Sequence, residues 1–540
     1  MAFFNSLASP GSADGSPHAR QGLQFSRLVA AIAHRASARA LAAKSAFVVT
    51  VVYAGLLFWL APHPPMADLP QHAGQVALLR ELLFGQSSWE PLLRINYFTP
   101  YLIGYGLTVP LSFVMPIADA MKLLLMLAFY GFVSCCVLLR RHFHGDERLD
   151  WLFIPGFLGF SYVFGFFTFL LAAPVALLFI LLADRYAQHP TSTDGVRLAG
   201  VGLVLFFSHG LAFLFASSIG VALLLFRVRR WPDTLLALLP YAPLAALSIG
   251  YAAASHYSEA ATGNEPSGTL WGEWPERFNF FNNIFGSPPY AAQDALFVAV
   301  AGVFMLWAPR LLKSSINRTL PAALIPMAAV LLVWLAAPAY TMKTNYIFQR
   351  FALFILPFYA LMFCRPASPS HNEDITQSRA CQLVLAMLCW LLLAGHTERL
   401  LRFAQESREF EVVRTAVEPG QRALSLVLES SSTAAKNQVA YLHHPLWYQA
   451  ENGGFVDYNF AWAPSQMVRF REDQLPAVLP FWNPERFSWM DHRGGDYRYF
   501  FVRHAQPLPS EFFRNDQCAV SLLKSSGHWS VFEATRCRPH

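Results

Sequence analysis

Long apolar stretches recur between Lys44 and Leu393 and are separated by short polar loops. Several of them reach about 17–25 residues, the length at which a helix crosses the hydrocarbon core of a bilayer. The 540-residue chain is 55% hydrophobic and only 14% charged, whereas soluble proteins usually carry about a quarter charged residues. The pattern predicts an α-helical polytopic membrane protein.

The basic residues orient these stretches, because Arg and Lys concentrate in cytoplasmic loops. With the N-terminus inside, the clusters Arg140-Arg141 and Arg227–Arg230 fall on the cytoplasmic side only if Tyr97–Pro116 lies along the outer leaflet. The prediction is then about eleven crossings: Ser45–Ala61, Ala118–Leu139, Trp151–Val163, Phe166–Ala183, Leu198–Phe207, Leu211–Phe226, Leu235–Ala254, Leu296–Pro309, Ala322–Ala337, Phe351–Cys364 and Leu383–Ala394. The segments Trp151–Val163 and Leu198–Phe207 are short for a full crossing. Each could instead form one long span with the apolar segment that follows it, Phe166–Ala183 or Leu211–Phe226. Topology accounts for the net charge of +6, and no nucleic-acid partner is predicted.

Three regions follow from this order. Residues 1–44 form a flexible cytoplasmic tail, residues 45–397 a transmembrane domain with an outer loop at 62–117, and residues 398–540 a soluble extracytoplasmic domain. The last region reads as a small α/β domain from its short strand-like runs, Ala423–Leu428, Gln438–His443, Tyr497–Arg503, Ala519–Leu523 and Trp529–Glu533. Cys518 and Cys537 flank its last predicted hairpin, where they form either a disulfide or two free thiols.

Asp68 is the principal candidate for chemistry, because it places a carboxylate in the first outer loop. In the segment Asp68-Leu69-Pro70-Gln71 it has the form of a helix N-cap with a capping box. A carboxylate beside the bilayer also suits a general base, since partial desolvation raises its pKa. Both roles stay open, and one does not exclude the other.

Four further ionisable residues are candidates for substrate binding. His72 follows Asp68 by four residues on the same helical face, where it binds a metal with Asp68, contacts a phosphate or lies at the interface. His209 lies between two apolar runs, as a functional histidine or one satisfied by a backbone carbonyl. Lys343 and Arg350 are outward cations that suit a lipid-linked phosphate, Arg350 more so, with snorkelling to headgroups as the alternative.

The first outer loop resembles a known family. The segment Asp68–Ala73 is followed by Gly85-Gln86-Ser87-Ser88-Trp89-Glu90-Pro91 and then by Asn96-Tyr97-Phe98-Thr99-Pro100. This order is similar to the GT-C superfamily of membrane glycosyltransferases, especially the aminoarabinose-transferase and protein O-mannosyltransferase branch. Leu69 stands where that branch usually has a second acid, and Thr99 occupies a region where it often has lysine.

The resemblance implies a GT-C-like fold and transfer of a sugar from a polyprenyl-phosphate carrier on the outer face of a bacterial-type inner membrane. It implies Asp68 as the catalytic residue and Tyr97, with His72, His209, Lys343 and Arg350, in substrate binding. Partners would be the lipid-linked donor, membrane lipids and an unidentified glycan, lipid or protein acceptor. No cofactor is certain, and a divalent metal at Asp68 and His72 is a candidate.

Two other functions stay open. A transporter or flippase of a lipid-linked substrate would need ionisable residues inside the spans, which are nearly absent, and no inverted repeat is evident. A non-catalytic GT-C-like assembly protein would account for the missing second acid at Leu69.

Overall fold

The computed structural model describes residues 42–227, 231–261, 268–278, 280–286, 292–318, 320–341, 344–365, 372–475 and 483–537. The chain forms two compact units, Met1–Val52 and Tyr53–His540. The predicted tail lies almost wholly outside the described residues. All contacts discussed below are internal to the second unit.

Apolar helices dominate the first three-quarters of the chain. Within the described residues, six helices are long and apolar enough to cross a membrane: Ala42–Trp59, Ile117–His142 (α4), Phe167–Gln188 (α6), Gly210–Arg227 (α8), Thr234–Ser255 and Gln377–Arg414. The last two join consecutive elements, namely α9 (Trp231–Ala237) with α10 (Ala242–Ala261), and α17 (Asn372–Glu406) with α18 (Arg408–Arg414). The chain is therefore an integral membrane protein by the length and composition of its helices.

Further helices lie between these six. They are α3 (Leu102–Leu111), α5 (Phe160–Phe164), α7 (Ser192–Ser208), α11 (Trp274–Phe278), α12 (Phe280–Phe285), α13 (Ala292–Leu311), α14 (Ile325–Ala336), α15 (Ile347–Arg350) and α16 (Ala352–Leu361). Four apolar segments of 10–17 residues lie in α3, α13, α14 and α16 and are shorter than a full crossing. The predicted number of about eleven spans therefore stays a prediction.

The predicted arm Trp151–Val163 is not a spanning helix. It folds into two 3-10 turns, Glu147–Phe153 and Pro155–Leu158, followed by the single turn of α5. Pro155, Gly156 and Gly159 interrupt the helical pattern, because proline lacks the donor and glycine lowers helix propensity. By contrast, α7 and α8 are separate helices that break at His209.

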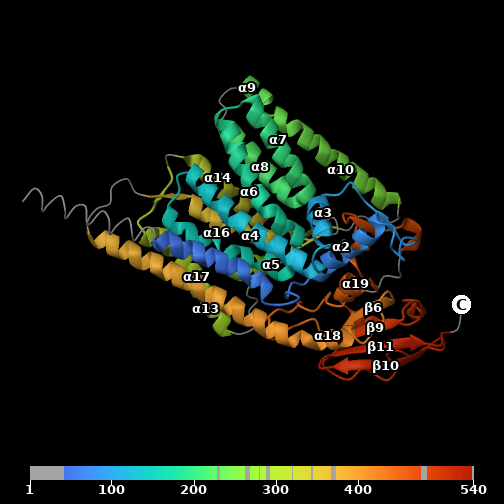
Figure 1. The fold of residues 1–540 in the computed structure, drawn as a ribbon. Helices are drawn as coiled ribbons and strands as arrows, with labels where there is room; N and C mark the ends of the chain where they lie inside the picture. The colour runs from blue at the N-terminus through green and yellow to red at the C-terminus, as the bar shows by residue number, and fades with distance from the viewer. Residues whose placement is uncertain are drawn as a thin grey trace, which may run out of the picture. The chain divides into compact units, whose positions relative to one another are not determined.

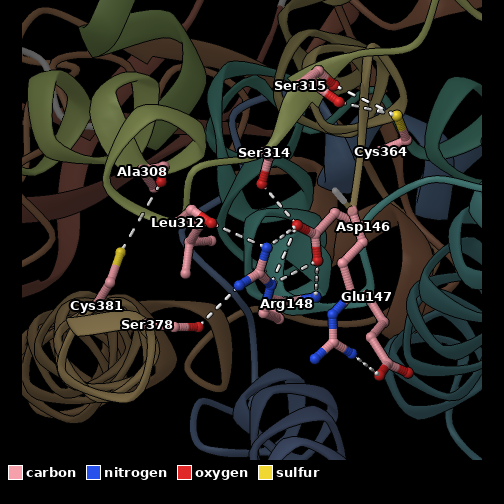
Figure 2. Close-up of polar contacts among 11 residues, drawn as sticks. Asp146, Glu147, Arg148, Ala308, Leu312, Ser314, Ser315, Cys364, Ser378 and Cys381 are labelled. Atoms are coloured by element: carbon pink, nitrogen blue, oxygen red, sulfur yellow. Dashed lines mark hydrogen bonds and ion pairs between the residues drawn. The ribbon is translucent and has the colours of Figure 1, made fainter. Parts of the chain in front are cut away.

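The helix α6 lies at the centre of the apolar part and packs against α4, α7 and α8 (Figure 1). Its side chains are largely buried, which fits a helix that is apolar on every face. On the predicted cytoplasmic side, a buried ion pair joins Arg148 to Asp146 at 2.6 Å. Figure 2 shows that Arg148 also donates to the Leu312 carbonyl and to Ser378 Oγ, so the pair joins the loops after α4 and α13 to α17.

The C-terminal region contains a mixed five-stranded sheet in the order β10-β11-β9-β6-β7. Its strands are β6 (Arg422–Val427), β7 (Phe455–Asp457), β9 (Tyr499–Arg503), β10 (Ala519–Ser526) and β11 (Trp529–Thr535). The strand β6 is parallel to β7 and β9, and the other pairings are antiparallel. The small C-terminal sheet predicted from the sequence is present, with α19 (Leu446–Asn452) beside it. Cys518 and Cys537 form a disulfide across the β10–β11 hairpin.

Two features connect this region to the first outer loop. The short strand β1 (Leu93–Ile95) pairs antiparallel with β8 (Val468–Phe470), and α2 (Leu69–Leu83) packs against α19 (Figure 1). The remaining strands are two-residue pairs, β2 (Ser315–Ile316) with β5 (Phe363–Cys364) and β3 (Tyr340–Thr341) with β4 (Thr344–Asn345). The boundary predicted at residue 397 lies inside α17, which continues without a break to Glu406; the predicted division into domains stays a prediction.

Candidate active site

Asp68 occupies the position immediately before α2, but its side chain does not cap that helix. Its φ and ψ are −91° and −8°, and no cap hydrogen bond is made by the carboxylate. The Asp68 carbonyl accepts from the His72 backbone N–H at 3.1 Å, so the helix begins here through its main chain. The capping-box alternative is therefore wrong, and the carboxylate oxygens are not used by the helix end.

The backbone at Asp68 is fixed by close contact with the turn after α5. The Asp68 N–H donates to the Phe164 carbonyl at 2.9 Å. Gly165 has a φ of +83°, and a Cβ built on it would lie 2.8 Å from the Asp68 nitrogen and 2.9 Å from the Leu69 nitrogen. Glycine is required here by both conformation and space.

Gln71, expected in the capping box, instead reaches into the C-terminal region. Its side-chain oxygen accepts from the Phe460 N–H at 2.8 Å, while its Nε2 donates to the Tyr458 carbonyl at 2.9 Å. The same nitrogen lies 3.1 Å from Nδ1 of His443. Because Nε2 of Gln71 is a donor, Nδ1 of His443 accepts, and the proton of the neutral ring is on Nε2.

This tautomer directs an N–H of His443 toward Asp68. The Nε2 atom of His443 lies 3.7 Å from Oδ1 of Asp68, slightly beyond a direct hydrogen bond. His443 is buried, which lowers the pKa of its ring to about 3 and keeps the ring neutral. It therefore presents a dipole, and not a charge, to the carboxylate.

The segment that carries His443 is not the predicted strand Gln438–His443. It consists of turns that begin near Ser432 and continue to α19. Asn437 in this segment donates from Nδ2 to the Pro65 carbonyl at 2.9 Å and to the Val163 carbonyl at 3.3 Å. Turn hydrogen bonds inside the segment, from the Tyr441 N–H to the Ser430 carbonyl and from the Leu442 N–H to the Val439 carbonyl, take the place of a strand ladder. The Asn437 contacts hold the loop before Asp68 against the turn that contains Gly165.

The electrostatic environment of Asp68 suits a base at neutral pH. The side chain retains only 16% of its exposure, and burial raises the pKa of the carboxyl to about 7. The positive charge of Arg350 acts in the opposite direction. Asp68 is thus the acid of this loop whose protonation changes near neutrality.

Arg350, at the end of α15, faces the same group of residues. Its guanidinium donates from Nη2 to the Asn345 carbonyl at 3.0 Å and lies 3.6 Å from the centroid of the Phe166 ring. Its charge acts on Asp68, His72 and Tyr101. The structure thus brings the predicted cation to the predicted carboxylate from the opposite end of the apolar region.

His72 lies one turn after Asp68 and is buried. Its Nδ1 lies 2.7 Å from the Tyr105 hydroxyl, which donates to Oε1 of Gln466 at 2.8 Å. The single hydroxyl proton is used at Gln466, so Nδ1 of His72 donates and its Nε2 carries the lone pair. Burial, with the nearby charge of Arg350, lowers the pKa of His72 to about 3. His72 is thus a neutral hydrogen-bonding group.

His209 reaches the margin of this group from the break between α7 and α8. Its ring meets Tyr101 and Phe169 edge-on, at centroid separations of 5.2 and 5.1 Å. The side chain is 1% exposed, and its Nδ1 makes no hydrogen bond within the described structure. A buried ring nitrogen is costly to leave without a partner. A functional role for His209 and a histidine satisfied by a backbone carbonyl both stay predictions.

The remaining candidates are elsewhere. Tyr97 is 63% exposed and follows β1, outside the group around Asp68. Thr99 is fully buried and donates to the Ser465 carbonyl, so it fixes a loop where a lysine would present a charge. Lys343 lies outside the described residues.

No group of three or more metal-binding side chains occurs among the residues that the structure describes. Asp68 and His72 alone supply two ligand types, fewer than a protein usually provides for a divalent cation. The metal stays a prediction.

The comparisons with known proteins find similarity to solved structures. No protein-family model and no curated protein matches the chain. The crystal structure of ArnT from Cupriavidus metallidurans bound to undecaprenyl phosphate is similar, at 13% sequence identity and a TM-score of 0.47. The match covers 92% of this chain and 99% of that chain.

The sequence reading missed the roles of Gln71 and His443. In the sequence, Gln71 fits a capping box, and His443 ends a predicted strand. Neither has a local sequence signal for its contact, because the partners come together only when α2 packs beside α19. Tyr105 and Gln466 were missed for the same reason.

Proposed function

We propose that the protein is a GT-C-type membrane glycosyltransferase that moves a sugar from a polyprenyl-phosphate carrier to an acceptor hydroxyl. The reaction would occur on the outer face of a bacterial-type inner membrane, with the N-terminus cytoplasmic and the C-terminal region extracytoplasmic. The observation that carries the proposal is the buried Asp68 carboxyl with a pKa of about 7 and a cation, Arg350, in electrostatic range. The motif order from Asp68 to Pro100 supports it.

In the proposed reaction, Asp68 accepts the proton of the acceptor hydroxyl as that oxygen attacks C1 of the sugar. The bond between C1 and the phosphate oxygen breaks, and the polyprenyl phosphate leaves with the electron pair. The proton remains on Asp68 until it passes to solvent or to the released phosphate. No other reactant is consumed.

Arg350 would stabilise the charge that develops on the leaving phosphate, because a planar guanidinium can donate two parallel hydrogen bonds to phosphate oxygens. The lone pair of His72 and the unpartnered nitrogen of His209 would accept hydrogen bonds from sugar hydroxyls. Tyr97, exposed beside the outer loop, would contact the carrier lipid at the interface. Lys343 would be a second phosphate contact.

The proposal is tested by transfer from a panel of radiolabelled polyprenyl-phosphate sugars, using purified protein in detergent with a lipid extract as acceptor. Label is expected to move from at least one polyprenyl-phosphate sugar, and not from the matching nucleotide sugar. Thermal unfolding of the same preparation shows whether the protein is folded. If folded protein transfers label from no member of the panel, the transporter or the assembly protein is favoured. Movement of intact donor across a vesicle membrane would select the transporter.

Replacement of Arg350 should alter the pH dependence of the reaction. The guanidinium charge holds the pKa of Asp68 below the value that burial alone would give, so Arg350→Gln should raise it further above 7. A base must be deprotonated to act, so the rising limb of activity should move to higher pH. The measurement is kcat/KM against pH.

Arg350→Lys is the matched variant, since it keeps the positive charge but loses the planar guanidinium that donates two parallel hydrogen bonds. It should leave the midpoint near that of the wild type while raising the KM for the donor. If Arg350→Gln and wild type give the same midpoint, Arg350 does not act on the base.

A further inference from the structure

A cluster of ionisable side chains joins the loop that precedes Asp68 to the C-terminal region. Nε2 of His63, in that loop, lies 2.8 Å from Oε1 of Glu451 in α19, and its Nδ1 lies 3.3 Å from Oε1 of Glu411 in α18. Arg414 approaches the other oxygen of each carboxylate, at 2.5 Å from Oε2 of Glu411 and 3.1 Å from Oε2 of Glu451. The cluster is therefore closed, with the two carboxylates between the histidine and the arginine.

The contacts of the His63 imidazole require a proton on both of its nitrogens. A carboxylate oxygen only accepts hydrogen bonds, whereas a neutral imidazole has one N–H and one lone pair. A neutral ring would therefore turn its lone pair toward Glu411 or Glu451. Arg414 pairs with both carboxylates, which favours their ionised form. With His63 protonated, the charges of the cluster cancel, and without that proton a net negative charge is left between the loop and the helices.

The surroundings of His63 also favour the charged imidazole. The residue is 5% exposed and stacks on Trp447 at a centroid separation of 4.2 Å, an arrangement that attracts a cation. Burial by itself would lower the pKa of His63, but the contacts with Glu411 and Glu451 outweigh it and hold that pKa above the ordinary 6.5. His444 faces the ring at a centroid separation of 6.1 Å, and burial lowers its pKa well below the usual range, so it stays neutral.

We propose that His63 is a pH-sensitive clamp, which ties the loop before Asp68 to α18 and α19 while its imidazole is protonated and releases that loop when the proton leaves. Histidine is the side chain whose charge ordinarily changes near neutral pH. The released segment would include the Ala67 and Asp68 N–H groups, which donate to the carbonyls of Val163 and Phe164 at 3.3 and 2.9 Å. The inference does not rest on the proposed sugar transfer, so failure of the transfer assay leaves it intact.

The test is the protection of residues 60–69 against amide hydrogen exchange, measured on the full-length protein from about pH 5 to about pH 9 and corrected for the intrinsic exchange rate. It uses the Asp68→Asn protein, because Asp68 itself titrates in this range. The pKa of His63 is raised in the closed state, so the clamp holds fully below 6.5 and weakens as pH rises through the raised pKa. Within that window, protection is expected to fall about tenfold for each pH unit.

The decisive variant adds His63→Gln to Asp68→Asn. Glutamine has no proton that titrates in this range, so the protection of the loop should no longer change with pH. The matched control adds His504→Gln instead. Nδ1 and Nε2 of His504 lie 2.9 Å from the Gln506 carbonyl and 3.1 Å from Ser530 Oγ, so this imidazole contacts a carbonyl and a hydroxyl in place of two carboxylates. Protection that still falls with pH after His63→Gln, or that stops falling in the control, would overturn the proposal.

Glu451→Gln, in the same background, tests the clamp while keeping the histidine, and it decides the matter if His63→Gln does not fold. The amide retains an oxygen that accepts from the His63 N–H, and Arg414 keeps Glu411 and Asn452 as partners. With one carboxylate fewer, the pKa of His63 should lie closer to its ordinary value, and the pH window in which protection falls should narrow. A window of unchanged width would contradict the clamp.

Discussion

Asp68→Asn is expected to lower the rate of sugar transfer about 10²- to 10⁴-fold, the range that a positioned general base contributes. The amide keeps the shape of the carboxyl but cannot accept the proton of the acceptor hydroxyl. Donor binding should change little, because Arg350 and His72 remain in place. The measurement is kcat and KM for the labelled donor, with Asp473→Asn, an exposed acid of the C-terminal region, as the control.

The same variant should be more stable than the wild type at alkaline pH. The folded-state pKa of Asp68, about 7, lies above the value of 3.8 expected for the unfolded chain, so folding favours the protonated acid. Ionisation of Asp68 therefore lowers the free energy of unfolding of the wild type as pH rises from 3.8 to above about 7. Asn has no ionisation to suppress, so its free energy of unfolding should exceed that of wild type by on the order of 4 kcal/mol at pH 8.

The advantage should shrink as pH falls from 7 toward 4 and vanish well below 3.8, where the wild-type acid is protonated in both the folded and the unfolded state. Thermal unfolding of both proteins across this range measures it. A mutant that is inactive and also less stable at every pH would point to a structural role for Asp68. Full activity in the mutant would remove Asp68 from the mechanism.

Gly165→Ala is expected to reduce transfer at least about tenfold and to destabilise the protein by about 1–3 kcal/mol. The added Cβ would lie 2.8 Å from the Asp68 nitrogen and 2.9 Å from the Leu69 nitrogen, both backbone atoms that cannot rotate away. The start of α2 would have to shift, and Asp68 would move with it. A displacement of about 1 Å at a catalytic group is sufficient for a large loss of rate.

Gly85→Ala separates this contact from backbone strain. Gly85 also has a positive φ, +63°, but a Cβ there meets no atom within 4 Å. It should lose stability through its conformation alone and keep the wild-type rate. Equal losses of activity in the two variants would show that the contact with Asp68 is not the cause.

Much of the fold was predictable, because apolar runs and turn residues are local signals. The helices α4, α6 and α8 and the strands β6, β9, β10 and β11 lie close to their predicted ranges. The failures also have physical causes. Trp151–Val163 is apolar enough for a span, but proline and glycine break it into turns. Gln438–His443 forms turns with backbone hydrogen bonds of its own instead of pairing in a sheet.

The candidate site was only partly predictable. Asp68 and His72 are four residues apart on one helix, so their proximity follows from helical geometry. Arg350 and His209 were identified as unusual polar residues, but nothing local indicated that they approach Asp68. His443 and Gly165 acquire their importance only through contact with its loop.

The amino-acid pattern alone was enough to predict a helical membrane protein with a small sheet after its last long helix, and to indicate Asp68 as the candidate acid. Periodicity and composition suffice for these conclusions because each depends on neighbours within a few residues. Only the tertiary structure shows that the Asp68 carboxylate does not cap α2 and that burial raises the pKa of this carboxyl. It also shows that Arg350 acts electrostatically on the Asp68 carboxyl and that His443 lies beside it. Those properties depend on long-range packing and on the solvent that packing excludes, and no local pattern records either.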